Sequence, residues 1–256
     1  MYCYQRLLKI LLLLTVFFVL NADINCLSQE IPLVTDKLTK ILNGVSPALK
    51  SELAGKELTL GSSLFIRIFK LQGQLEVWLE KNGRYRFFKT YPICSYSGYL
   101  GPKLHEGDWQ SPEGFYRVTP DQMNPDSDYH LSFNIGYPND YDTLLRRNGS
   151  SIMVHGSCSS KGCFAMKNYR MEEIYTLAHF AFLGGQEAFD IHVFPFPMTD
   201  ENLYRFRFSP WIEFWKNLQE GYTAFEQSYM VPFITAEKGK YIVDRSVKLA
   251  MSQKQQ

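Results

Sequence analysis

Residues 155–163 carry the side chains whose chemistry stands out most clearly in this sequence. The segment reads His-Gly-Ser-Cys-Ser-Ser-Lys-Gly-Cys, so that His155 and Cys163 flank a turn of mostly small residues. A cysteine attacks as its thiolate and needs a nearby base, together with donors for the oxygen that becomes negative. His155 can be that base, and Gly162 lets backbone N–H groups approach a substrate closely. The segment therefore predicts cysteine acyl-transfer chemistry.

Two other interpretations of these residues stay open from the sequence. Cys163 could be a buried structural thiol or a disulfide partner. The second alternative is a zinc site formed by His155, Cys158, Cys163 and His192. A Cys-x4-Cys spacing is unusual for zinc. We therefore favour the nucleophile and expect neither a metal nor another cofactor.

The elements next to this segment should hold its two ends. Residues 151–154 form an apolar, strand-like run that stops at His155. A helical pattern follows Cys163 and ends at Gly184-Gly185, with these apolar residues on one face: Ile174, Leu177, Ala178 and Ala181. Residues 155–163 are therefore predicted to form a turn between a strand and a helix.

Strands and loops make up much of the remaining sequence. Between residues 58 and 91 apolar and polar residues alternate, and Asn82-Gly83 predicts a tight hairpin turn. Residues 189–194 form a further strand, which prolines end. Residues 95–140 are rich in Gly, Pro, Asp and Tyr and predict loops. Functional residues are concentrated in such loops.

Two helices are predicted on either side of this β-rich part. Apolar residues at helical spacing over 32–42 predict one helix, which Asn43-Gly44 should end. Ser209-Pro210 predicts the start of the other. Its aromatic residues recur at helical spacing, and we expect them to pack in the core rather than to bind a ligand.

The first residues of the sequence predict export. Arg6 and Lys9 precede an apolar run over residues 10–20, which has the charge layout and length of a signal-peptide core. The run is short for a membrane span. No good small-x-small cleavage site follows, so an uncleaved anchor is the alternative. We expect a periplasmic protein that is secreted across the inner membrane or anchored to it.

Charge and cysteine content narrow the function further. The 27 basic and 26 acidic residues give a formal net charge of +1, which is not the balance of a nucleic-acid-binding protein.

Beyond the export segment, an oxidising compartment favours one cysteine pair and one free thiol. A free Cys158 would tend to pair with Cys163. We therefore predict a disulfide between Cys94 and Cys158, which leaves Cys163 free.

Several motifs together resemble a known family. Residues 155–163 end in Ser-Lys-Gly-Cys before Ala165-Met166, and related motifs lie at Pro92–Cys94, Ser97-Gly98, Leu100–Lys103, Ser111–Tyr116, His130–Asn139 and His192–Phe196. Over roughly residues 55–225 the sequence is similar to the L,D-transpeptidase catalytic domain (YkuD) family, and within it to the YafK-like branch. Two departures are a shortened turn after Gly156 and Lys161 in place of a histidine.

The resemblance implies an α+β, mainly β fold with a short N-terminal helix and a C-terminal helical segment. It also suggests four regions along the chain. We expect a signal peptide or anchor over 1–26, a helical leader over 27–55, a catalytic domain over 56–200 and a C-terminal helical extension over 201–256.

The resemblance also implies the substrate and the reaction. Cys163 and His155 would act on peptidoglycan stem peptides through a thioester. An amine acceptor would make the protein a transpeptidase, whereas water would make it an amide hydrolase that releases lipoprotein covalently bound to peptidoglycan. An inactive peptidoglycan-binding module is an alternative of another class, although the retained His, Gly and Cys argue against it.

Further residues have expected supporting roles. The N–H groups of Gly162 and Cys163 would hold the oxyanion, and the carbonyl of Gly156 could orient the imidazole. Candidates for lining the groove are His130, His192, Lys161 and Ser160. Both histidines could instead be structural. Lys161 could favour an anionic acceptor, lower the pKa of the thiol, or simply be solvated.

Overall fold

The structure is a computed structural model that describes residues 33–244, so the expected export segment, residues 1–26, lies outside the described residues. A 3-10 turn spans Pro120–Gln122. The described helices are α2 (Asp36–Ala54), α3 (Asp140–Leu144), α4 (Asn168–Leu183), α5 (Asp200–Arg205) and α6 (Ile212–Ser228). The described strands are β1 (Leu64–Phe69), β2 (Gln74–Lys81), β3 (Arg84–Pro92), β4 (Gly114–Val118), β5 (Met123–Asn124), β6 (Ser132–Asn134), β7 (Met153–His155), β8 (Phe164–Ala165), β9 (Phe189–Phe194), β10 (Phe233–Glu237) and β11 (Lys240–Asp244).

These strands form two sheets and a separate hairpin. The first sheet has the order β3-β2-β1-β9-β4, and its neighbours are antiparallel except for β1 and β9. The second has the order β5-β6-β7-β8, in which β7 and β8 are parallel. Strands β10 and β11 pair only with each other in the described chain. The predicted α+β fold is confirmed, but the sequence analysis did not anticipate this last hairpin.

The local patterns explain several of these strands. Asn82 and Gly83, with φ values of 55° and 77°, make the turn between β2 and β3. Two successive left-handed residues match the right-handed twist of the strands that they join. Strand β9 spans the predicted residues 189–194 and is buried at nearly every position. It lies between β1 and β4 inside the sheet, where a mostly apolar strand belongs.

The first helix is longer than predicted. Asn43-Gly44 does not end α2, which continues to Ala54 because Leu49 and Leu53 extend its buried face. Gly44 also lacks the left-handed backbone conformation that terminates a helix at glycine. Tertiary packing therefore overrides the local stop signal.

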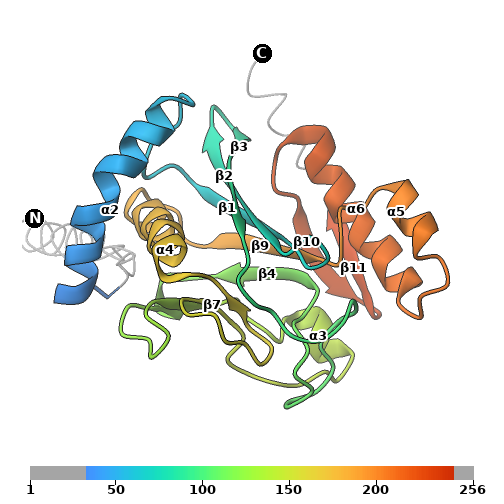
Figure 1. Cartoon of the computed structure of the whole chain (residues 1–256). Coiled ribbons are helices and arrows are strands. Elements are labelled where there is room, and N and C mark those ends of the chain that lie inside the picture. Colours follow the sequence, from blue (N-terminus) through green and yellow to red (C-terminus); the bar gives the residue numbers. More distant parts are fainter. Residues whose placement is uncertain (1–32, 245–256) are drawn as a thin grey trace, which may run out of the picture. The chain divides into compact units, whose positions relative to one another are not determined.

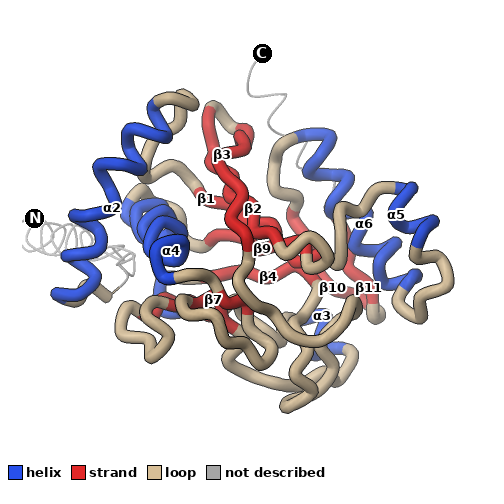
Figure 2. The backbone as a smooth tube through the Cα atoms, in the orientation of Figure 1, coloured by secondary structure: helices blue, strands red, loops and turns tan. Residues whose placement is uncertain are grey.

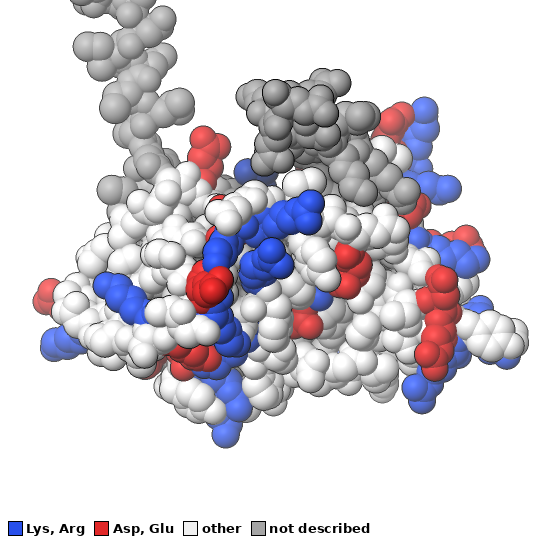
Figure 3. Space-filling view, turned by 90° about the horizontal axis from the view of Figure 1, so that it is seen from above, with Lys and Arg blue, Asp and Glu red and all other residues white. Residues whose placement is uncertain are grey.

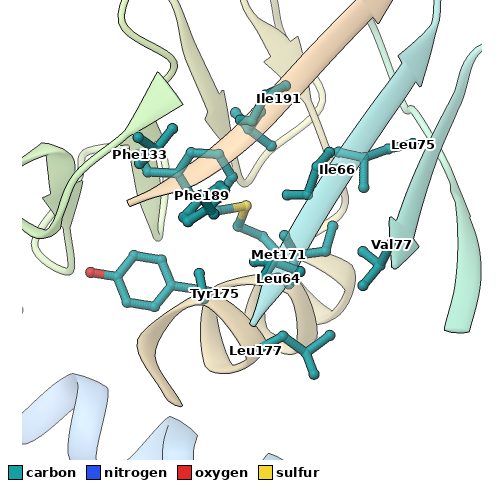
Figure 4. Packing of buried hydrophobic residues seen from close by; sticks show 14 of the residues in the cluster. Leu64, Ile66, Leu75, Val77, Phe133, Met171, Tyr175, Leu177, Phe189 and Ile191 are labelled. Carbon is teal, nitrogen blue, oxygen red and sulfur yellow. The ribbon is translucent and has the colours of Figure 1, made fainter. Parts of the chain in front are cut away.

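The core has parts on both faces of the first sheet. Figure 1 shows α2 and α4 on one side of the sheet and α5 and α6 on the other, while Figure 2 shows the long loops that surround the second sheet. In Figure 4, Met171 and Tyr175 of α4 pack among residues of both sheets, including Phe133 and Ile191. The other part of the core, which includes Trp215 of α6, is mainly aromatic. The predicted burial of aromatic residues from this helix is confirmed.

The distribution of charged side chains on the surface can be compared with the composition of the sequence. On the face seen in Figure 3, basic side chains lie among acidic ones rather than forming one broad basic area. This distribution agrees with the nearly balanced formal charge. Within residues 33–244 no helix combines the length and the apolar character needed to cross a membrane.

Candidate active site

Strands β7 and β8 bring the predicted nucleophile and base together. Their parallel register pairs His155 with Ala165, and Cys163 comes directly before β8. The N–H of Met153 donates to Cys163 Sγ at 3.4 Å, which places the thiol beside the start of β7. Because side chains alternate along a strand, His155 and Cys163 lie on the same face, diagonal to one another. The turn thus places a thiol and an imidazole on one face of the second sheet.

His155 is held in the form that a general base requires. Its ring is 2% exposed, and Nδ1 lies 2.5 Å from the carbonyl oxygen of Gly156. A carbonyl can only accept, so Nδ1 carries the proton and Nε2 keeps its lone pair. Burial lowers the pKa of His155, an effect that the Gly156 contact partly offsets. The neutral ring, which contacts Tyr129 in a tilted arrangement with ring centroids 4.6 Å apart, can therefore accept a proton at Nε2.

Cys163 is partly exposed and is a free thiol. Burial raises the pKa of its thiol, and the Met153 N–H and the positive charge of Lys103 oppose that effect. The Sγ–H group donates weakly to the carbonyl oxygen of Ser151 at 3.5 Å. A raised thiol pKa and a lowered imidazole pKa favour an uncharged pair at rest. Proton transfer from Sγ to His155 would then accompany attack rather than precede it.

Gly162 does not have the role predicted for it. Its N–H donates to Ser97 Oγ at 2.6 Å, so this group is already occupied and is not a free oxyanion donor. Glycine is still required here, because φ is +114° and a Cβ would approach Ile152 Cδ1 to 3.2 Å. Within the described residues the N–H of Cys163 has no hydrogen-bond partner. Of the two predicted donors, this N–H is the one that is not already occupied.

Two serines that the sequence analysis did not single out hold the end of the turn that leads to Cys163, residues 156–163, which we call the nucleophile loop. Ser97 accepts from Gly162, and its own N–H donates to Ser111 Oγ at 3.2 Å. Ser111 Oγ donates to the carbonyl oxygen of Cys163 at 3.3 Å, and Ser160 Oγ donates to the same oxygen at 2.7 Å. Both Ser97 and Ser111 fall in the motifs that resemble the family, which was the available signal.

A disulfide reinforces this arrangement. Cys94 and Cys158 are bonded, as the sequence analysis predicted, across a sequence separation of 64 residues. Closing a loop of this length lowers the entropy of the unfolded chain and stabilises the fold by about 4 kcal/mol in the chain-entropy model. Next to Cys94, Ser95 pairs with Ala165 of β8. The disulfide thus ties the turn before Cys163 to the segment that flanks β8.

Comparison with known proteins identifies the family. The model of the L,D-transpeptidase catalytic domain (YkuD) matches residues 66–182. The YafK protein of Escherichia coli strain K12, which has a provisional L,D-transpeptidase name, is 39% identical over 200 residues, or 78% of this chain and 81% of its own. The chain belongs to the L,D-transpeptidase catalytic domain family. YafK of Escherichia coli O157:H7 matches to the same extent.

Solved structures give weaker matches. The helical cell shape determining protein Pgp2 of Campylobacter jejuni is 23% identical with a TM-score of 0.40, covering 56% of this chain and 54% of its own. Bd1075 of Bdellovibrio bacteriovorus is 18% identical with a TM-score of 0.39, covering 71% and 79%.

In this member of the family, a buried ion pair anchors the loop that supports the nucleophile. Lys70 and Glu113 are both fully buried, with Nζ 3.0 Å from Oε1. Lys70 also donates to the carbonyl oxygens of Gly101 and Ser111, each at 2.8 Å, while Trp215 Nε1 donates to Glu113 Oε2 at 2.8 Å. Burial lowers the pKa of Lys70, against the attraction of Glu113. The well-paired charges connect α6 with the loop that carries Ser111.

The predicted groove residues lie in different places. Ser160 is at the site and bonds to the carbonyl of Cys163. Lys161 is exposed, with Nζ 5.7 Å from the Trp109 ring centroid, and Lys103 is the lysine whose charge lowers the pKa of Cys163. Lys161 thus fits the solvated alternative, and the charge that lowers the pKa of the thiol comes from the buried Lys103 instead.

The two candidate histidines also differ. His130 is near the site, since a Cβ on Gly156 would lie 2.9 Å from its Cβ, but its Nε2 contacts Glu172 Oε1 at 2.8 Å. His192 lies on the face of β9 that points away from the second sheet, where it is surrounded by aromatic rings. The groove position expected for His192 was wrong, because alternation along β9 points its neighbours Ile191 and Val193 toward the second sheet instead.

The zinc alternative is not supported by the geometry. Cys158 is in the disulfide, and His192 is on the far face of the first sheet. Within residues 33–244 no group of three or more His, Cys, Asp or Glu side chains is placed to hold a metal ion.

Proposed function

We propose that this protein is an exported cysteine acyl-transfer enzyme of the L,D-transpeptidase type, which acts on peptidoglycan stem peptides through a thioester at Cys163. The observation that supports the proposal is that Cys163, directly before β8, and His155, at the end of the adjacent β7, lie on the same face. The hydrogen bond from His155 Nδ1 to Gly156 leaves Nε2 to accept the thiol proton. Family membership supports peptidoglycan as the substrate class.

The first half-reaction follows from this geometry. Cys163 Sγ attacks the carbonyl carbon of a stem-peptide amide while its proton passes to His155 Nε2. The carbonyl oxygen becomes negative near the N–H of Cys163. When the tetrahedral intermediate collapses, the C–N bond breaks and His155 returns the proton to the leaving amine. The remaining acyl group is joined to Sγ as a thioester.

The second half-reaction determines the class of enzyme. An amine that attacks the thioester gives a new amide and restores the thiol, which is transpeptidation. Water gives a carboxylic acid instead, and the enzyme would then release peptidoglycan-bound lipoprotein. The partial exposure of Cys163 and the short turn after Gly156 favour access of water to the thioester, so hydrolysis is the second candidate.

The proposal of export rests on the sequence, from the basic residues and apolar run that begin the chain. Membership of a family that acts on peptidoglycan supports a location in the periplasm or at the cell wall. Fractionation of cells that express the full chain should find it in the periplasmic or membrane-anchored fraction. Recovery from the cytoplasmic fraction alone would contradict export.

One experiment tests the reaction and separates the candidates. Purified protein is incubated with defined muropeptides and with a wall-linked lipopeptide, with and without a free amine acceptor, and all products are weighed by mass spectrometry. An amine adduct supports transpeptidation, and free peptide supports hydrolysis. Binding with no product from any substrate would support the inactive binding module and contradict both enzymatic candidates. Cys163→Ala is the control for products that arise without the thiol.

A further inference from the structure

Trp109 is an exposed aromatic residue at the border of the nucleophile loop. Its side chain is 62% exposed. The neighbouring Gln110 contacts that loop, since a Cβ on Gly162 would lie 3.6 Å from the Gln110 carbonyl oxygen. Lys161 Nζ lies 5.7 Å from the Trp109 ring centroid. The indole therefore lies on the surface next to Lys161, and its neighbour Gln110 lies next to Gly162; Lys161 and Gly162 directly precede Cys163.

The loop that carries Trp109 is built to hold it in this position. Asp108 accepts hydrogen bonds at both carboxylate oxygens, from the N–H groups of Leu104 and His105 at Oδ2 and from Gln110 N–H and Lys103 Nζ at Oδ1. Trp109 itself has a φ of +55°, in the left-handed region that bulky residues rarely adopt. Such conformations persist where surrounding contacts enforce them, and they are common at ligand-binding positions.

A second exposed ring comes from the same loop. Tyr99 is 88% exposed, and the Gln110 side chain bridges to its backbone, accepting from Tyr99 N–H at 2.9 Å and donating to its carbonyl at 2.6 Å. Gly98 makes room for this bridge, because a Cβ there would lie 2.0 Å from Gln110 Oε1. Two aromatic side chains are thus presented to solvent by one well-fastened loop.

We propose that Trp109 and Tyr99 form a saccharide-binding surface for the glycan strand that carries the stem peptide. This inference rests on the proposed function. A stem peptide is joined to a sugar, so a sugar ring must lie within a few residues of the amide that Cys163 attacks. The apolar C–H face of a pyranose can cover an exposed aromatic face without loss of the sugar's hydroxyl hydration. The surface would make the enzyme favour peptides that are still attached to glycan.

The charges on the loop favour a glycan over a bilayer as the occupant. Exposed tryptophan and tyrosine can also mark a membrane-facing surface. The charges around these rings largely cancel, however, because Asp108 is paired with Lys103, and Glu106 is opposed by Lys161 next to Trp109. This surface therefore offers no net positive charge to attract anionic lipid headgroups, whereas a neutral sugar ring needs none.

Binding to glycan can be measured without catalysis. The Cys163→Ala protein and its Trp109→Ala derivative are titrated with glycan strands from which all peptides have been removed. We expect the Trp109 change to weaken binding about five-fold, and Trp109→Phe to restore most of it, in keeping with one lost stacking contact. The matched control is Phe208→Ala, which removes a ring that is 86% exposed and lies under Arg207 beyond α5. No binding by the parent protein, or equal losses from both alanine changes, would overturn the inference.

Kinetics provide the second test. With Cys163 intact, kcat/KM is measured on a disaccharide-peptide and on the same peptide without sugar. Trp109→Ala should reduce the preference for the sugar-bearing substrate, mainly through KM, whereas Phe208→Ala should not. Equal losses on both substrates would show a structural role and overturn the inference. Inactivity of the parent protein on both would contradict the proposed function, while the glycan titration would still decide this inference. Co-sedimentation with anionic vesicles is measured for the same variants. If Trp109→Ala abolishes it while glycan binding is unchanged, the rings face a membrane and the inference is overturned.

Discussion

Two buried histidines, His155 in β7 and His192 in β9, show how similar residues acquire different roles. Each is 2% exposed and lies in a β-strand, and burial lowers the pKa of each. His155 has a carbonyl that fixes its Nδ1 proton, and the thiol of Cys163 lies directly before the adjacent strand β8. His192 Nδ1 has no partner in the described residues, and the ring packs against Phe65 and Phe115 with centroids 4.7 Å away. Neighbouring groups, rather than burial, distinguish a candidate base from a core residue.

Removing the nucleophile should have the largest effect of all. Cys163→Ala should reduce turnover of muropeptides by at least about 10⁴-fold, because no other described thiol is free to form the acyl-enzyme. The fold should be retained, since a small residue replaces a small one. Product mass spectrometry and circular dichroism measure the two effects. Near-normal turnover by a correctly folded variant would refute the mechanism.

Substituting each histidine tests the comparison itself. His155→Gln should lower kcat by about 10²–10⁴-fold through loss of the general base. His192→Phe should change kcat by no more than about two-fold, because a ring of comparable size replaces one that already packs among rings. Steady-state kinetics at neutral pH compare the two variants. Comparable losses of kcat in both would show that His192 also supports the reaction and would contradict the comparison.

The stability of the protein should depend on pH through His192. Burial and the charge of Arg67 lower the pKa of His192 to about 3, from an ordinary value of 6.5. In the window between these values the unfolded chain binds the proton and the native state does not, so stability falls as pH decreases. Urea denaturation at pH 7 and pH 4.5 should show a smaller loss for His192→Phe than for the parent. Identical losses would contradict a neutral, buried His192.

The smallest effect is expected from removing one hydrogen bond that holds the nucleophile loop in place. Ser97→Ala removes the acceptor for the Gly162 N–H and should lower the free energy of unfolding by about 1 kcal/mol. If this lost free energy acts only by letting Cys163 move out of position, kcat/KM should fall by less than about ten-fold. Ser159→Ala, at an exposed position in the same turn, is the control. A gain in activity would instead show that the freed N–H is a useful oxyanion donor.

Some features of the site could be predicted because they depend on residues close together in sequence. The turn from His155 to Cys163 was predicted to lead from a strand into a helix, and this was wrong in one respect, because the short strand β8 comes before α4. The chemistry of the turn could still be inferred from residue types and spacing. The hairpin at Asn82-Gly83 and the strand over 189–194 likewise follow local periodicity and turn chemistry. The cysteine pairing followed from the chemistry of an oxidising compartment, in which a second free thiol near Cys163 would be a hazard.

The sequence alone thus determined which residues can react and the period of the elements that hold them, because both depend on short-range steric and chemical preferences. The tertiary structure alone decided which face His192 occupies, that Ser97 rather than a substrate oxygen accepts from Gly162, and that Lys103 is the lysine that acts on the thiol. It also decided that α2 runs beyond Gly44. These outcomes depend on contacts between distant segments, whose packing energies exceed the local preferences that a sequence pattern expresses.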